Sequence, residues 1–171
     1  MDVGTHLLSG IILAYLFRNN TNWLLIILAS ELPDLIGELF YQAGRLSIGK
    51  KIKVFYDTEI SESSKKLGHS AYLIPYNFLH SIFSIMLLLI VSVPTAIVLA
   101  YSTHIFLDLI SHSRNTWGIM LFWPFSTTRL GSKKDWWQWK WFKSKRVIYF
   151  NIVSYSLVFL IYLCLRVFRY G

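Results

Sequence analysis

Three side chains that can bind a metal ion recur at intervals of four residues in one apolar segment. They are His104, Asp108 and His112, within residues 100–112. At about 100° per residue, this spacing places all three on one face of a helix. An ionised Asp inside a bilayer costs about 2.5–3.5 kcal/mol, so a segment that carries one between two imidazoles requires compensation. A bound cation is the simplest compensation, and a metal site is the first hypothesis.

The composition predicts that this segment lies in a membrane protein. The chain has 171 residues, of which 54% are hydrophobic and only 15% charged, too apolar for an ordinary soluble domain. Its apolar segments are residues 7–17, 23–40, 78–93, 95–110 and 147–165. Only the last is long enough to cross a bilayer unaided, because about 20 residues are needed; the others suit short or tilted helices. We predict an all-α, polytopic membrane helical bundle of about five helices.

We interpret residues 1–171 as one membrane-embedded domain with three parts. The core covers residues 4–125, a basic Trp-rich interfacial segment covers residues 126–146, and a C-terminal transmembrane helix covers residues 147–165. Residues 133–143 interleave Trp with Lys, which favours an anchor on anionic lipid over nucleic acid because a membrane helix follows at once. The single Cys164 excludes an internal disulfide.

The distribution of charge predicts the orientation. If the five helices alternate, all but three of the 17 Lys and Arg residues fall in loops on the side of the N-terminus. The positive-inside rule then places the N-terminus in the cytoplasm. The same topology gathers the metal-competent residues at the cytoplasmic end of the bundle, where His80 opens its helix and Asp34 lies toward the far end of its own. The predicted metal ligands are His6, Asp34, His80, His104, Asp108 and His112.

Imidazole and carboxylate ligands suit zinc, with manganese or iron as alternatives. Two ions that share a carboxylate would clamp both the attacking and the leaving oxygen of a phosphoryl group, and Asp108 is the natural shared ligand. Glu38 follows Asp34 by four residues and is a candidate base or additional ligand. The alternative is that these polar side chains only hydrogen-bond across the helices.

Several motifs follow one another with the order and spacing of a known family, over residues 4–125. They are His6, Pro33-Asp34, His80-Ser81, His104-x-x-x-Asp108, Trp117-Gly118-Ile119 and Trp123-Pro124-Phe125. In these motifs the chain resembles the LexA-binding, inner-membrane-associated proteins regarded as metal-dependent hydrolases. The family is in turn similar to zinc-dependent phospholipase C in one metal site.

This resemblance implies a phospholipase C-like arrangement with one or two zinc ions. One ion would be surrounded by Asp34, His80, His104 and Asp108, and a second would be contacted by His6 and Asp108. The chain departs from the family pattern at Ile36, where an acidic residue is usual, and at Pro75-Tyr76, where a His-Arg pair is usual.

We therefore expect a hydrolase integral to the plasma (inner) membrane, with its N-terminus and site on the cytoplasmic side. Its substrate would be a lipidic phosphoester such as a phospholipid or polyprenyl phosphate, attacked by metal-activated water, with catalytic residues Asp34, Glu38 and Asp108. A metal ion or proton transporter is the main alternative, because intramembrane carboxylates and imidazoles also mark ion pathways. A third is a membrane-anchored protein whose basic loops bind a cytoplasmic partner protein, as the family's LexA-binding name implies.

Overall fold

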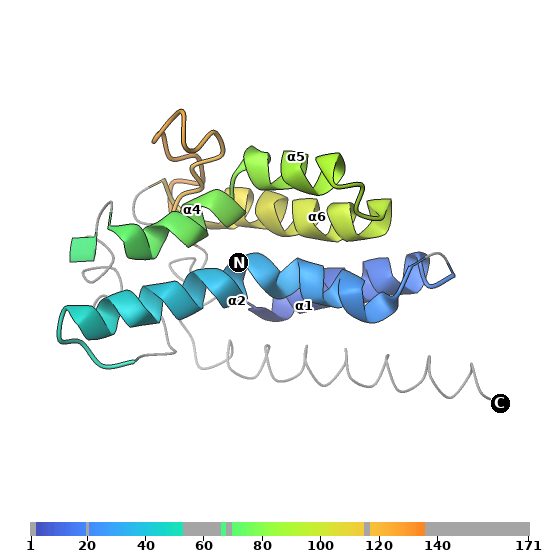
Figure 1. Cartoon of the computed structure of the whole chain (residues 1–171), viewed down its shortest axis with the longest axis horizontal. Helices are drawn as coiled ribbons and strands as arrows, with labels where there is room; N and C mark the ends of the chain where they lie inside the picture. Colours follow the sequence, from blue (N-terminus) through green and yellow to red (C-terminus); the bar gives the residue numbers. More distant parts are fainter. Residues whose placement is uncertain (1–2, 20, 53–65, 68–69, 115–116, 136–171) are drawn as a thin grey trace.

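The computed structural model describes residues 3–19, 21–52, 66–67, 70–114 and 117–135. Within those ranges the ordered elements are helices, and no strand is formed. They are α1 (Val3–Leu16), α2 (Trp23–Ser47), the 3-10 helix η1 (Ala71–Leu73), α4 (Ile74–Leu79), α5 (Ile82–Ile90) and α6 (Thr95–Ser111). The helices run along the long axis in two layers, with α1 and α2 in one and α4, α5 and α6 in the other (Figure 1). The all-α prediction is confirmed for this part of the chain, and the predicted helix at residues 147–165 lies outside it.

Helix α2 is longer than the sequence predicts. The side chain of Asn22 caps it by accepting a hydrogen bond from the Leu24 N–H at 3.0 Å, and the helix continues past residue 40 to Ser47. The extension is held by packing, because Tyr41 is buried against Leu67, Leu73, Tyr76 and Trp117. Asp34 consequently lies near the middle of α2 rather than toward its end, in the residue after the internal Pro33.

The apolar segment at residues 78–93 does not form one helix that His80 opens, so this prediction is wrong. His80 ends α4, with its N–H bonded to the Tyr76 carbonyl at 3.0 Å, and Ser81 is extended. The chain then turns by 64° into α5. The N–H of Ile82 bonds to the carbonyl of Leu121 at 2.8 Å, so a distant loop satisfies the first donor of α5. His80 therefore lies at a joint between two helices.

Small residues let α1, α2 and α6 approach one another closely. Their shared core contains Ala14, Ile26, Ala29, Ala96 and Ala100. A Cβ atom on Gly10 would lie only 2.2 Å from the Ser30 Oγ, so α1 and α2 cross in close contact at this point. Helices α1 and α2 are antiparallel. One helical turn from Gly10 toward the N-terminus and one turn from Ser30 toward the C-terminus therefore lead in the same direction along the bundle. The crossing thus places His6 and Asp34 at the same level.

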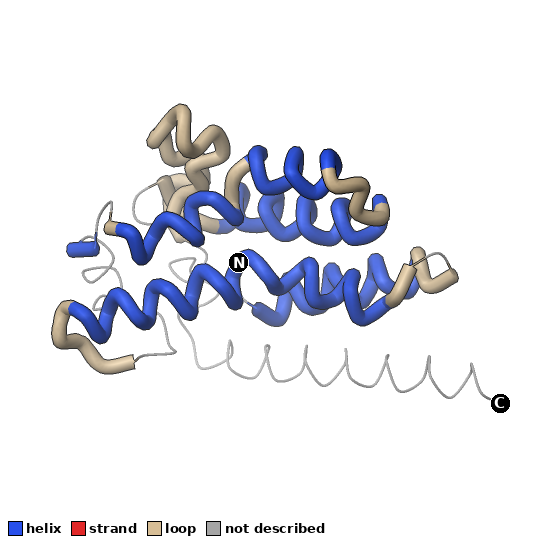
Figure 2. Tube along the Cα trace, in the orientation of Figure 1, coloured by secondary structure: helices blue, strands red, loops and turns tan. Residues whose placement is uncertain are grey.

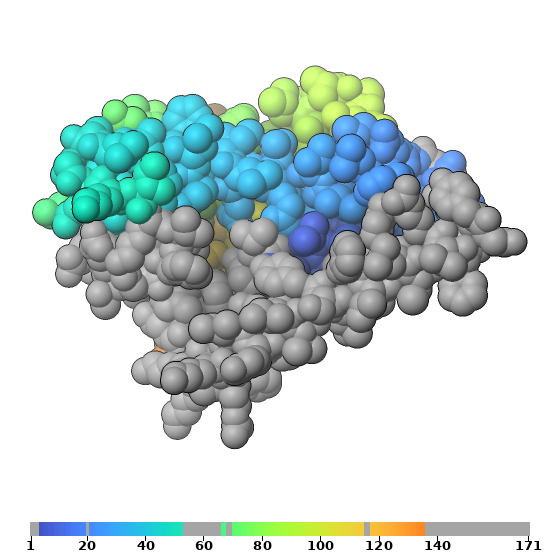
Figure 3. Space-filling view, turned by 90° about the horizontal axis from the view of Figure 1, so that it is seen from below, coloured from blue at the N-terminus to red at the C-terminus, as the bar shows by residue number. Residues whose placement is uncertain are grey.

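Apolar side chains also cover the outside of the bundle. Helix α2 is exposed along its length (Figure 3), and its exposed side carries Leu24, Leu28, Leu32, Leu35, Leu39 and Leu46. By length and hydropathy, no single helix in the described ranges is sufficient to cross a membrane. Residues 71–79 and 82–90, which form a bent pair, are together long and apolar enough to cross one. Helix α6 is apolar but too short by itself.

Candidate metal centre

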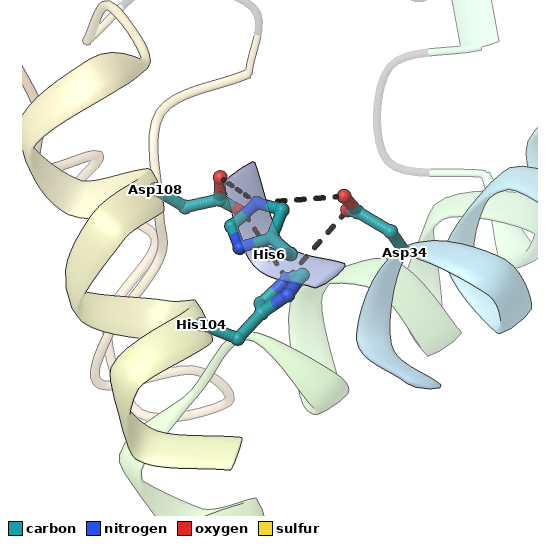
Figure 4. A group of neighbouring side chains, drawn as sticks. All are labelled: His6, Asp34, His104 and Asp108. Carbon is teal, nitrogen blue, oxygen red and sulfur yellow. Dashed lines mark hydrogen bonds and ion pairs between the residues drawn. The ribbon is translucent and has the colours of Figure 1, made fainter. Parts of the chain in front are cut away.

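The helices bring the predicted ligands from distant parts of the sequence to one place. His6 comes from α1, Asp34 from α2, and His104 and Asp108 from α6 (Figure 4). His80 joins them from the break between α4 and α5. The side chain of Asp34 is 25% exposed, whereas those of His6, His80, His104 and Asp108 are 0% exposed. The group is therefore a buried cluster that is open on the side of α2.

Two imidazoles in the cluster point their Nε2 atoms at each other. The Nδ1 of His80 lies 2.8 Å from the Tyr76 carbonyl, and the Nδ1 of His104 lies 2.7 Å from the Ser30 carbonyl. A carbonyl only accepts hydrogen bonds, so both Nδ1 atoms carry hydrogen, and each Nε2 of a neutral ring presents a lone pair. These Nε2 atoms are 3.2 Å apart. Two lone pairs at this distance repel unless a proton or a metal cation lies between them.

Two carboxylate oxygens complete this donor set. The Oδ2 of Asp108 lies 3.3 Å from the Nε2 atoms of both His80 and His104. The Oδ1 of Asp34 lies 3.4 Å from the Nε2 of His80 and 3.7 Å from the Nε2 of His104. A tetrahedral zinc ion with bonds of about 2.0–2.1 Å requires donor atoms about 3.3 Å apart. Two nitrogens and two oxygens thus have the chemistry and the spacing that suit zinc.

The other oxygen of Asp108 faces a second pair of imidazoles. Its Oδ1 lies 3.1 Å from the Nε2 of His6 and 3.3 Å from the Nε2 of His112. The Oδ2 of Asp34 is 3.8 Å from the same nitrogen of His6. The ring of His6 stacks on that of His104, with centroids 3.8 Å apart. Each oxygen of Asp108 therefore faces its own pair of imidazoles, as a carboxylate shared between two ions would.

Tyr76 supports His80 in two ways. Its carbonyl accepts the hydrogen of Nδ1, and its ring stacks on the imidazole with centroids 4.1 Å apart. The hydroxyl donates to the carbonyl of Trp117 at 3.1 Å, and Gly37 makes room, because a Cβ there would lie 3.0 Å from the Tyr76 ring. The position at which the sequence departs from the resembled family pattern thus orients one of the candidate ligands.

Glu38 lies one turn after Asp34 on α2. Its carboxylate is half-buried and accepts a hydrogen bond from the side-chain amide of Gln42. Within the described part, His6, Asp34, His104 and Asp108 form a group whose donor atoms all lie within 4.8 Å of one another, and Glu38 does not belong to this group. Its role as a base stays a prediction.

Sequence reasoning missed a carboxylate at the edge of the cluster. Asp135 is buried and accepts hydrogen bonds from the backbone N–H of Ser113 at 2.7 Å and from its hydroxyl at 2.8 Å. Its Oδ1 lies 3.7 Å from the Nδ1 of His112. The one sequence signal was an acidic residue within the Lys and Trp run of the predicted interfacial segment.

The ionised form of Asp135 is favoured by its partners. Burial of the carboxyl opposes ionisation, but the interaction with His112 and the two hydrogen bonds from Ser113 outweigh it and hold the pKa of Asp135 below its usual range. The carboxylate of Asp135 therefore faces the Nδ1 of His112 with a negative charge.

Comparison with known proteins places the chain in a family. The model of the family described as YdjM inner membrane protein matches residues 1–170. No curated protein and no solved structure matches the chain. The chain thus belongs to the YdjM inner membrane protein family, in agreement with the expected membrane location.

Proposed function

We propose that this inner membrane protein is a metal-dependent hydrolase whose substrate is a lipidic phosphoester, of the phospholipid or polyprenyl phosphate type. The observation that carries the proposal is the convergence of the Nε2 atoms of His80 and His104, 3.2 Å apart, on the carboxylate oxygens of Asp34 and Asp108. Two carboxylates next to them, the buried Asp108 and the partly exposed Asp34, add negative charge that a cation would neutralise. A proton shared between the two rings would satisfy the nitrogens alone, whereas a divalent cation would satisfy both nitrogens and both carboxylates.

A bound zinc ion would lower the pKa of a coordinated water toward about 7 and polarise a phosphoryl oxygen. The residues of the chain divide the remaining tasks. His80 and His104 would hold the ion by nitrogen atoms whose direction is set by the backbone carbonyls that accept from the opposite ring nitrogens. Asp108 has no exposed surface and supplies the oxygen that faces both of them.

Asp34 marks the side on which a substrate enters. It is the ligand with substantial exposure, 25% of its side chain against 8% for His112. It lies on α2, whose outer side is lined with leucines, so acyl or prenyl chains could lie along α2 while the phosphoryl group reaches Asp34. Glu38, one turn further on the same helix, is in this proposal the group that accepts the proton of the attacking water.

The first test measures the metal itself. We expect purified wild-type protein to contain zinc, manganese or iron in a fixed ratio to protein, and His104→Ala and Asp108→Ala to lose it. Thr103→Ala is the matched control, because it alters the residue beside His104 without removing a donor. Equal metal content in all four proteins would contradict the proposed metal centre.

The second test measures turnover in lipid. The protein in nanodiscs is given either phospholipids or a polyprenyl phosphate, and release of the polar product is followed for the wild type, Asp34→Asn and Glu38→Gln. Metal-dependent release from one lipid class, lost in both variants, would support the hydrolase and identify its substrate. Metal or proton flux in proteoliposomes without lipid turnover would favour the transporter. A cytoplasmic partner retained after substitution of all six candidate ligands would favour the interaction protein.

A further inference from the structure

The buried carboxylate of Asp135 lies outside the donor set of the proposed centre and has no part in the function proposed above. It belongs to the loop that follows α6, drawn as loop in Figure 2. A buried carboxylate usually has specific polar partners. Two of its contacts are with Ser113, and the third is the approach to His112.

The loop is fastened so that Asp135 must lie beside His112. The N–H of Ser132 donates to the carbonyl of His112 at 2.7 Å, and the N–H of Arg114 donates to the carbonyl of Ser132 at 3.2 Å. A Cβ atom on Gly131 would lie 2.4 Å from the carbonyl oxygen of His112, so the two backbones touch. These contacts fix the loop against the end of α6 independently of the carboxylate.

His112 is placed between two carboxylates. Its Nε2 faces the Oδ1 of Asp108 at 3.3 Å, and its Nδ1 faces the Oδ1 of Asp135 at 3.7 Å. A histidine that ligates a metal by one nitrogen generally donates the hydrogen of the other to a carbonyl or carboxylate, which sets the tautomer and the direction of the ring. His80 and His104 both use backbone carbonyls for this purpose. For His112, the group in the corresponding place is Asp135.

We propose that Asp135 is a positioning residue that holds His112 with the Nδ1 hydrogen directed at Asp135 and the Nε2 lone pair directed at the metal centre beside Asp108. The inference rests on the proposed metal centre. It makes residues 130–135 a part of that centre, although they lie in the segment that the sequence assigns to the membrane interface. Asp135 itself ligates nothing in this proposal and acts through His112 alone.

The test compares the zinc affinity of full-length Asp135→Asn with that of Ser113→Ala by competition with a chelator. Asn keeps an oxygen for the Ser113 N–H but removes the charge that faces His112, and we expect zinc to bind about 10–100-fold more weakly. Ser113→Ala removes one hydrogen bond to Asp135 and keeps the charge, so its affinity should stay near that of the wild type. Equal losses in the two variants, or no loss in Asp135→Asn, would overturn the proposal.

A double-mutant cycle separates positioning from a purely structural role. If Asp135 acts through His112, Asp135→Asn should weaken zinc binding in the wild type but have no further effect in the His112→Ala background. An equal effect in both backgrounds would show that Asp135 supports the fold instead. The d–d absorption of Co²⁺ bound in place of zinc gives a second readout, which should change in Asp135→Asn and not in Ser113→Ala.

His104→Ala distinguishes failure of this inference from failure of the proposed function. If His104→Ala binds zinc as the wild type does, the metal centre is wrong and the inference falls with it. If His104→Ala loses zinc while Asp135→Asn retains full affinity, the centre stands and only the role of Asp135 is wrong.

Discussion

The two ends of the bundle are built from the same three helices and have opposite chemistry. At one end, α1, α2 and α6 meet through Ala14, Ile26, Ala29, Ala96 and Ala100, and the contact is apolar. At the other end, the same helices supply His6, Asp34, His104 and Asp108. The crossing of Gly10 and Ser30 lies between the two ends.

The difference between the two ends shows that helix packing at one place can support a buried polar cluster at another. Small residues bring the helix axes together at the apolar end, and this spacing continues into the polar end, where imidazoles and carboxylates take up the space. The close crossing at Gly10 and Ser30, between the two ends, therefore sets the positions of the donor atoms. Four substitutions test this division, in order of their expected effect on zinc binding.

The largest effect is expected at Asp108, whose two oxygens face four imidazoles. Zinc at about a thousand times its Kd should stabilise the wild type by about 4 kcal/mol and raise its Tm by about 8–16 °C. In Asp108→Asn this zinc-dependent shift should disappear, whatever the Tm of the metal-free variant. The measurement is thermal unfolding in detergent with and without zinc. A zinc-dependent rise in the Tm of Asp108→Asn as large as that of the wild type would show that the polar end does not bind zinc through Asp108.

The second effect is expected at the crossing itself. Gly10→Ala adds a Cβ atom 2.2 Å from the Ser30 Oγ, so α1 must move away from α2 and carry His6 with it. We expect a stability loss of about 1–2 kcal/mol from the forced separation and zinc binding weaker by about tenfold or more, since small displacements of donors are costly. Denaturant unfolding and chelator competition measure the two quantities.

A compensating change checks this interpretation. In Gly10→Ala combined with Ser30→Gly, the clashing side chain is removed and zinc affinity should recover, even though glycine within α2 lowers stability by about 1 kcal/mol. Affinity that stays low in the double variant would show that the crossing does not set the donor positions.

A smaller effect on zinc is expected from the far part of the apolar end. Ala14→Val overfills the core beyond the crossing and should cost about 1–3 kcal/mol of stability. Because the crossing separates it from the ligands, zinc affinity should change by no more than about threefold. A larger change would mean that the ligands sense the whole length of α1.

The smallest effect is expected at the cap of α2. Asn22→Ala removes the acceptor of the Leu24 N–H and should lower stability by about 1 kcal/mol. Zinc affinity and stoichiometry should equal those of the wild type in equilibrium dialysis. Any loss of metal in this variant would show that general destabilisation, and not a change at the donors, governs binding.

The sequence predicts the parts of the site that depend on regular local geometry. The four-residue spacing of His104, Asp108 and His112 places their side chains together, because helix periodicity is a local property. Their side chains do converge, with the Nε2 of His104 and of His112 each 3.3 Å from Asp108. The common location of His6 and Asp34 follows from alternating helices of suitable length.

Features that depend on distant contacts could not be predicted in this way. Residues 78–93 have the composition of one helix, and the break at His80 depends on the carbonyl of Leu121, far along the chain. The length of α2 depends on Tyr41 packing against residues of a later segment. The position of Asp135 depends on a loop that pairs with the end of α6. None of these contacts leaves a periodic pattern in the sequence.

The joint at His80 gives the cluster one adjustable member. His6, Asp34, His104 and Asp108 project from within helices α1, α2 and α6, so their Cα atoms move with those helices. His80 follows the last turn of α4 and precedes an extended residue, so a small change in backbone torsion at this joint shifts His80 relative to α5 together with the last turn of α4, which carries its partner Tyr76. We therefore expect differences in ionic radius, as between zinc and manganese, to be accommodated mainly by a shift of His80.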